Sequence, residues 1–145
     1  MSNIYLNFFI LKMFYYCNLN KQNVDNIFKL KTLPDKSFDK FIYYYIPRLN
    51  LSNNTILLSL CILKKNKEKL NINENSIYLI ALILLRLADK IHEDDHYFND
   101  EWAKELKIDL SDFNYLEYKL LVTLDFNVYV SNNEFKMMKK DFLSI

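Results

Sequence analysis

Two histidines lie four residues apart in a short acidic run, and this spacing can bind a metal ion. The segment from His92 to His96 reads H-E-D-D-H, which fits the H-E-x-x-H pattern of zinc proteases. On a helix both imidazoles would share one face, Glu93 would be the general base, and Glu117 could serve as a third ligand. Both middle positions are Asp, however, where the packed helix of a zinc protease needs apolar or small residues. The sequence therefore favours solvated polar residues at a helix end, with a zinc hydrolase as the weaker alternative.

A second unusual carboxylate, Glu117, lies within an apolar stripe. Apolar side chains stand three, four and seven residues from it, at Phe113, Leu120, Leu121 and Leu124. A buried carboxylate needs a partner, because its charge is costly to remove from water. Two interpretations stay open. In the first, Glu117 has a structural role only, either at an exposed edge of the stripe or in an internal pair with Lys90. In the second, Glu117 contacts another protein.

The composition excludes several classes of enzyme and binding protein. The chain has 145 residues, the size of one domain, and no glycine, which rules out glycine-rich phosphate loops and the G-x-S-x-G nucleophile elbow. A net charge of +1 and only two arginines argue against a nucleic-acid surface or an anionic membrane surface. Cys17 and Cys61 match no metal or redox spacing, which indicates two ordinary buried thiols in a reducing compartment. We identify no signal peptide and expect the protein in the cytoplasm, the nucleus or both.

The candidate residues are positioned by a stretch from Ile77 to Asp95. Its first nine residues, Ile77 to Leu85, are all hydrophobic. A helix that is apolar on every side is normally buried on every side, and this run is shorter than the ~20 residues needed to cross a bilayer. Arg86, Asp89 and Lys90 then interrupt it. We therefore expect the central helix of a helical domain, with its polar end at a functional site.

Helix signals surround this central stretch. A serine caps the predicted helix over 38–46, which ends before Pro47, and another caps the predicted helix over 53–70. Further helices are predicted to begin near residues 99 and 111, and a capping box predicts a last helix to about Leu143. The residues that carry these signals are, in order, Ser37, Ser52, Asn99, Ser111 and the pair Ser131 and Glu134. Helices of this kind, without strand alternation, predict an all-α domain.

The segment from Ala88 to Ser131 contains a spaced set of residues that fits one family. In order they are Ala88, Lys90, Glu93 or Asp94, Asn99, Trp102-Ala103-Lys104, Phe113-Asn114, Leu116-Glu117, Leu124-Asp125-Phe126 and Val130. With these residues the segment resembles the second half of the cyclin box of P-type cyclins, also called U-type. The resemblance implies a single cyclin box of five helices around a central buried helix over 36–130. It also implies an N-terminal helical arm over 1–35 and one C-terminal helix over 131–145.

The resemblance further implies a regulatory subunit rather than an enzyme. Members of this family bind and activate cyclin-dependent Ser/Thr protein kinases, so a kinase is the expected partner, with no cofactor, metal ion, nucleic acid or membrane. The lysine and glutamate that contact the kinase N-lobe in the family correspond to Lys90 and Glu117. The apolar positions that receive the αC helix of the kinase correspond to Ile91, Leu121, Phe126 and Val128.

The chain also departs from the family pattern. Ile91 stands where the family has Phe, and the residues from Glu105 to Lys107 replace its Gly-Gly, so the turn there must differ in conformation. An alternative function is a cyclin-fold transcription adaptor of the transcription factor IIB kind, which binds nucleic acid and polymerase, although the net charge of +1 speaks against it. Because an unpartnered cyclin exposes an apolar face, self-association in isolation is a further expectation.

Overall fold

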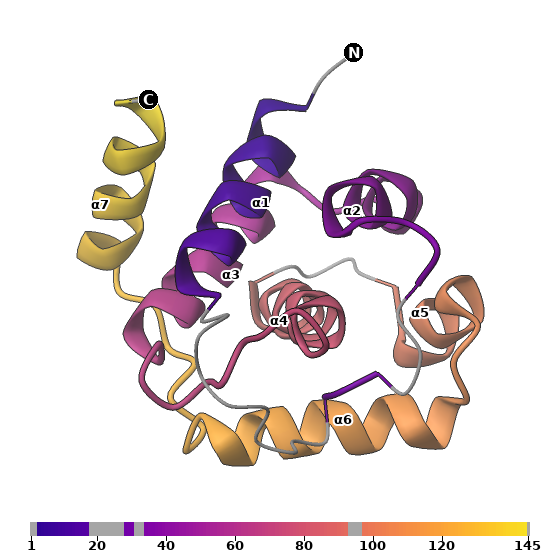
Figure 1. Ribbon diagram of the computed structural model, residues 1–145. Helices are drawn as coiled ribbons and strands as arrows, with labels where there is room; N and C mark the ends of the chain where they lie inside the picture. The colour runs from indigo at the N-terminus through magenta and orange to yellow at the C-terminus, as the bar shows by residue number, and fades with distance from the viewer. Residues whose placement is uncertain (1–2, 18–27, 31–33, 93–96, 145) are drawn as a thin grey trace.

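The computed structural model describes residues 3–17, 28–30, 34–92 and 97–144, and all regular elements within them are helices. This finding confirms the all-α prediction. Seven α-helices and one short 3-10 helix are present in the described residues (Figure 1). Their bounds are α1 Ile4–Tyr16, α2 Phe38–Tyr45, η1 Ile46–Leu49, α3 Asn53–Lys65, α4 Ile77–His92, α5 Asn99–Leu106, α6 Leu110–Thr123 and α7 Asn132–Leu143.

Helix α4 is the centre of the fold, as its apolar run predicts. In Figure 1 it is seen nearly end-on, with the other helices arranged around it. It packs against α2, α3 and α6. Of its residues from Ile77 to Asp89, all but Leu79 are buried, because neighbours cover it on several sides. The last part of the predicted stretch, residues 93–95, lies outside the described residues.

Local signals explain where the surrounding helices begin. The Ser52 hydroxyl accepts a hydrogen bond from the Thr55 N–H at 3.1 Å, which confirms this N-cap. The predicted capping box also forms, since Ser131 Oγ accepts from the Glu134 N–H and Glu134 Oε1 accepts from the Ser131 N–H. Helix α6 begins one residue before the predicted Ser111, because the Asp109 carboxylate caps it by accepting from the Ser111 N–H at 2.9 Å.

Helix α3 ends earlier than the sequence predicts. The predicted helix runs to residue 70, whereas α3 ends at Lys65, so residues 66–70 of the prediction lie outside the helix. The cause is a tertiary contact of Asn66. Its side-chain amide donates to the carbonyl of Ile62 at 2.9 Å and to the carbonyl of Asn127 at 2.8 Å, which fastens the end of α3 to the segment after α6.

Helices α1 and α7 pack on α3 on the side away from α6 (Figure 1). Tyr5 stacks on Phe142 with ring centroids 4.4 Å apart, and Lys12 Nζ lies 2.7 Å from a carboxylate oxygen of Asp141. The division of the chain into an arm over 1–35, a box over 36–130 and a helix over 131–145 stays a prediction. None of the described helices is long and apolar enough to cross a lipid bilayer.

Candidate protein-docking site

Glu117 sits in a cluster of polar groups where α4, α5 and α6 meet. Lys90 Nζ lies 2.8 Å from Glu117 Oε1, so the internal ion pair considered from the sequence is present. The Asn99 amide donates to the same oxygen at 3.3 Å, and Arg86 Nε lies 3.8 Å from Oε2. The Glu117 side chain is only 10% exposed, whereas that of Lys90 is 44% exposed. Lys90 is therefore the member of the pair that another protein can reach.

Arg86 is the buried cation of this cluster. Its side chain is 1% exposed and lies over the ring of Trp102. It donates to the carbonyl of Tyr97 at 2.7 Å, to Asn99 Oδ1 at 2.5 Å and to Asp89 Oδ2 at 3.3 Å. Burial lowers the pKa of Arg86, while the nearby carboxylates of Glu117 and Asp89 raise it and so favour the charged form. Arg86 therefore joins α4 to the start of α5.

Helical spacing explains why these groups converge. Arg86, Asp89 and Lys90 occupy positions i, i+3 and i+4 of α4, which share one side of a helix. Asn99 is the first residue of α5, and its amide also donates to Asn114 of α6 at 2.7 Å. The contacts of Arg86 and Asn99 in this cluster were not predicted from the sequence. The available signal was an arginine that interrupts a hydrophobic run four residues before the lysine of interest.

The four predicted apolar positions differ in exposure. Ile91 is exposed at the end of α4, and Phe126 is exposed beyond the end of α6. Leu121 and Val128 are partly buried against the core. Leu121 stands one turn, ~6 Å, along α6 from Glu117. The structure thus joins Lys90 and Glu117 directly, while the apolar positions lie on α4, on α6 and in the segment that follows α6. Their role in binding a partner stays a prediction.

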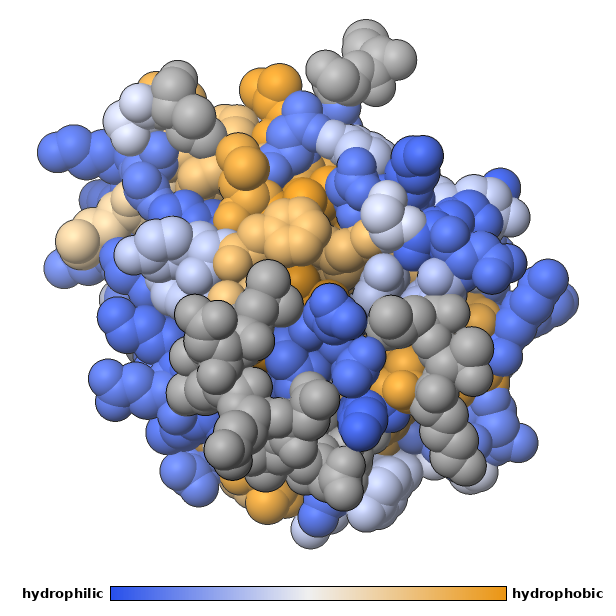
Figure 2. Space-filling view, in the orientation of Figure 1, coloured by the Kyte–Doolittle hydropathy of each residue, from blue (hydrophilic) through white to orange (hydrophobic). Residues whose placement is uncertain are grey.

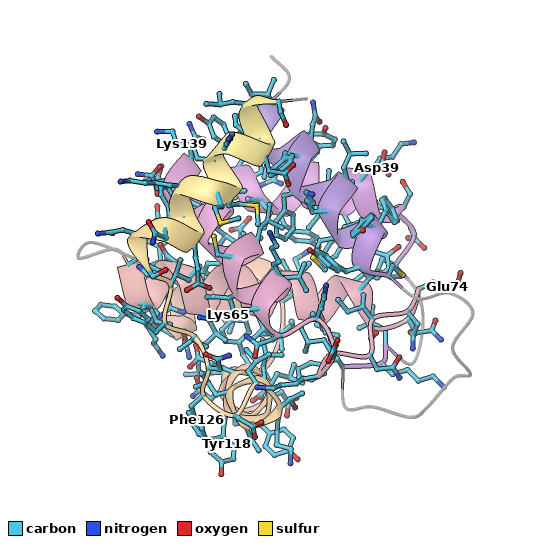
Figure 3. The ribbon with its side chains drawn as sticks, turned by 90° about the vertical axis from the view of Figure 1, so that its left-hand side faces the viewer. Asp39, Lys65, Glu74, Tyr118, Phe126 and Lys139 are labelled. Carbon is cyan, nitrogen blue, oxygen red and sulfur yellow. The ribbon has the colours of Figure 1, made fainter. Side chains whose placement is uncertain are left out.

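The backbone after α6 holds Phe126 outward. Asp125 and Phe126 both have left-handed φ values, 52° and 58°, which are unusual for residues other than glycine. The Phe126 N–H donates to the carbonyl of Leu121 at 2.8 Å and so closes the turn. Figure 3 looks along α6 and shows Phe126 and Tyr118 both at the edge of the molecule, turned away from the core.

Helix α6 adds exposed apolar side chains that the sequence analysis did not assign to a site. It buries Phe113 and Leu120 and turns a second face to solvent. That second face carries Tyr115, Tyr118 and Val122, all of them exposed. These three residues form an apolar face on α6, and Ile91 on α4 and Phe126 after α6 are further exposed apolar side chains. Such a surface is typical of a protein-docking site.

The structure gives no support to the zinc alternative. Glu93 and His96 lie outside the described residues, and His92 ends α4. Within the residues that the structure describes, no group of three or more His, Cys, Asp or Glu side chains could hold a metal ion. Glu117, the imagined third ligand, pairs with Lys90 instead.

The cysteines have the character of structural thiols. Cys61 is buried in α3, and burial raises its pKa to about 11, so the thiol stays protonated and unreactive at neutral pH. Cys17 is partly buried, and burial also raises its pKa. The expectation of a buried thiol is thus confirmed for Cys61 and met only in part at Cys17.

The fold defines a class of protein, an all-helical domain built around a buried central helix. The family model named Cyclin matches residues 14–128, which is most of the chain and includes all six predicted site residues. The chain belongs to the cyclin family. Members of this family are regulatory rather than catalytic. A comparison with curated proteins found no matching sequence.

Proposed function

We propose that this chain is a P-type cyclin that binds a cyclin-dependent protein kinase and activates it by docking on the αC helix. The observation that carries the proposal is Lys90, which is exposed, paired with a buried Glu117 and followed directly in the chain by exposed Ile91. Phe126 supplies a further exposed apolar side chain beyond the end of α6. An accessible cation in an apolar surround offers both anchoring area and a directional contact. The P-type assignment rests on the residue pattern between Ala88 and Ser131.

The expected mechanism is a shift in the conformation of the kinase. A helix of the partner lies against the apolar surface, while the Lys90 ammonium donates to a carbonyl or carboxylate at one end of that helix. Glu117 holds the ammonium in place, and the Asn99 amide in turn holds Glu117 by donating to the same carboxylate oxygen. A cyclin that binds only the active position of αC raises the population in which the Lys–Glu pair of the kinase forms. The catalytic groups belong to the kinase, and we expect the complex in the cytoplasm or the nucleus.

The test is capture of a kinase by the tagged chain. Wild-type protein is incubated with native extract, and the retained kinases are identified by mass spectrometry and assayed for protein kinase activity. We expect the double variant Ile91→Glu, Phe126→Glu to retain at least tenfold less kinase, because it places two charges in the apolar surface. Both side chains are exposed, so the fold tolerates the changes.

Met137→Glu is the matched control for this experiment. Met137 is as exposed as Phe126 but lies on α7, away from the proposed site. The control should retain kinase at the wild-type level. Failure of the wild type to retain any cyclin-dependent kinase, or equal retention by the double variant, would show that the proposal is wrong.

A further inference from the structure

Helix α1 turns a row of uncharged side chains to solvent on the face away from α6. Ile4 and Leu11 are each 60% exposed, Phe14 is exposed, and Asn7 between them is half-buried. Their positions 4, 7, 11 and 14 have the alternating spacing of three and four that places residues on one side of a helix and forms the seam of a helix pair. Figure 2 shows apolar side chains gathered on the upper part of the molecule, over α1. We call these four residues the α1 seam.

The surface around the seam has the shape that helices use to pack. Leu11 forms a ridge between two hollows of similar size. One, of about 380 Å³, lies toward α7 and is lined by Ile4, Phe8 and Phe142 among others. The other, of about 390 Å³, lies toward α2 and includes Phe14 and Tyr43 in its lining. A ridge beside grooves matches a second surface of the same kind, because ridges of one helix fit grooves of another.

Charge indicates which partner fits. Lys12 is the only charged residue of α1, and Asp141 of α7 neutralises it at 2.7 Å. The helix has no acidic residue in its first turn and no basic residue in its last turn, so its side chains leave the helix dipole uncompensated. Asp39 of α2 is the one charged residue among the described residues that line the two hollows, so a strongly acidic partner finds no opposite charge here. An antiparallel copy of α1 places each helix start beside a helix end and compensates both dipoles.

We propose that α1 pairs in antiparallel fashion with α1 of a second copy of this chain. Residue numbers facing each other then add to 18, so Ile4 faces Phe14 of the second copy and Asn7 faces Leu11 of the second copy. Each Phe14 ring covers the hollow beside the opposite Ile4. The contact is isologous and therefore closes as a dimer. It lies across the molecule from α6 (Figure 1), so each copy keeps its kinase-docking surface free, and the proposal does not depend on kinase binding.

Sedimentation velocity of the purified chain over a concentration series reaching about 100 µM tests the dimer. We expect a monomer–dimer equilibrium for the wild type, and at least tenfold weaker dimerisation for Leu11→Glu. Leu110→Glu, an exposed leucine on α6, is the matched control and should dimerise as the wild type does. Circular dichroism checks that each variant is folded. A monomeric wild type, or a Leu11→Glu variant that dimerises normally, would overturn the proposal.

A second variant tests the register. In Asn7→Lys, Leu11→Glu the introduced lysine of each copy faces the introduced glutamate of the other, so we expect the dimer to return. A parallel pair would place like charges together, and absence of recovery would overturn the antiparallel arrangement.

If dimers form instead through the exposed apolar surface of α6, Phe126→Glu will abolish them and Leu11→Glu will not. That result would also overturn the proposal. It would not bear on kinase binding, which the capture experiment tests separately.

Discussion

Glu117 shows how one buried carboxylate divides its contacts between stability and binding. Its two cationic neighbours differ in accessibility, with Arg86 almost wholly buried and Lys90 partly exposed. A buried charge that loses its partner keeps the full cost of desolvation, whereas an exposed partner is replaced by water. Arg86 therefore holds the fold together at the junction of α4, α5 and α6, and Lys90 is free to serve binding.

The difference predicts unequal costs for two similar substitutions. Arg86→Met should lower the free energy of unfolding by about 3 kcal/mol, because it removes a buried cation that pairs with Asp89 and donates to the Tyr97 carbonyl. Lys90→Met should lower it by less than about 1 kcal/mol, since the lysine is exposed and Glu117 keeps Asn99 and Arg86. Urea unfolding of the two variants measures both values. Equal losses would contradict the division of roles.

At this scale the sequence allowed half of the cluster to be predicted. The need for a cation beside Glu117 follows from burial alone, and Lys90 was the natural candidate on the preceding helix. The part played by Arg86 depends on the carbonyl of Tyr97 and the amide of Asn99, which come from the chain after α4. Helical periodicity places side chains on a face of their own helix, but it does not say which groups of other segments meet that face.

Among the elements, the turn between α5 and α6 shows how the chain manages without glycine. Lys107 adopts the left-handed conformation with φ 57°, and the Ile108 N–H donates to the carbonyl of Ala103 at 2.9 Å. This hydrogen-bond pattern usually ends a helix with glycine at the left-handed position. The turn between α5 and α6 thus places a lysine in a strained backbone, at a cost of roughly 1 kcal/mol.

Glycine at this position should stabilise the protein. Lys107→Gly is expected to raise the free energy of unfolding by about 0.5–1 kcal/mol, because the left-handed strain is removed. Lys104→Gly is the matched control, since Lys104 lies inside α5 in the ordinary helical conformation and the same change there should lower stability by about 1 kcal/mol. Thermal unfolding distinguishes the two signs. A loss in both variants would show that position 107 carries no strain.

Helix boundaries could be predicted from the sequence where a nearby side chain caps the helix, as Ser52 and Ser131 do. They could not be predicted where a residue far away in the chain determines the end of the helix. The end of α3 depends on a bond from Asn66 to a carbonyl 61 residues further along the chain. The lysines after Asn66 favour helix by their own propensity, and this local preference is overridden by the tertiary contact.

The whole molecule is built on one hydrophobic core that reaches from Leu6 of α1 to Phe142 of α7. Its centre could be predicted, because a run that is apolar on all sides must be surrounded. How α1 and α7 pack on α3 could not, since α1 is apolar on most of its faces and the sequence does not select the one that is buried. A single core of this kind implies that the described helices unfold together.

Truncation of a side chain in α4 tests this cooperativity. Leu84→Ala should lower the free energy of unfolding by about 3 kcal/mol, because Leu84 is wholly buried and leaves a cavity. Leu79→Ala, in the same helix but only partly buried, should lower the free energy of unfolding clearly less.

Trp102, the only tryptophan, is buried in α5, so its fluorescence follows that helix while circular dichroism follows all of the helices. We expect both signals to report one urea midpoint in each variant, lower for Leu84→Ala. An earlier fluorescence transition would show that α5 unfolds separately from the core.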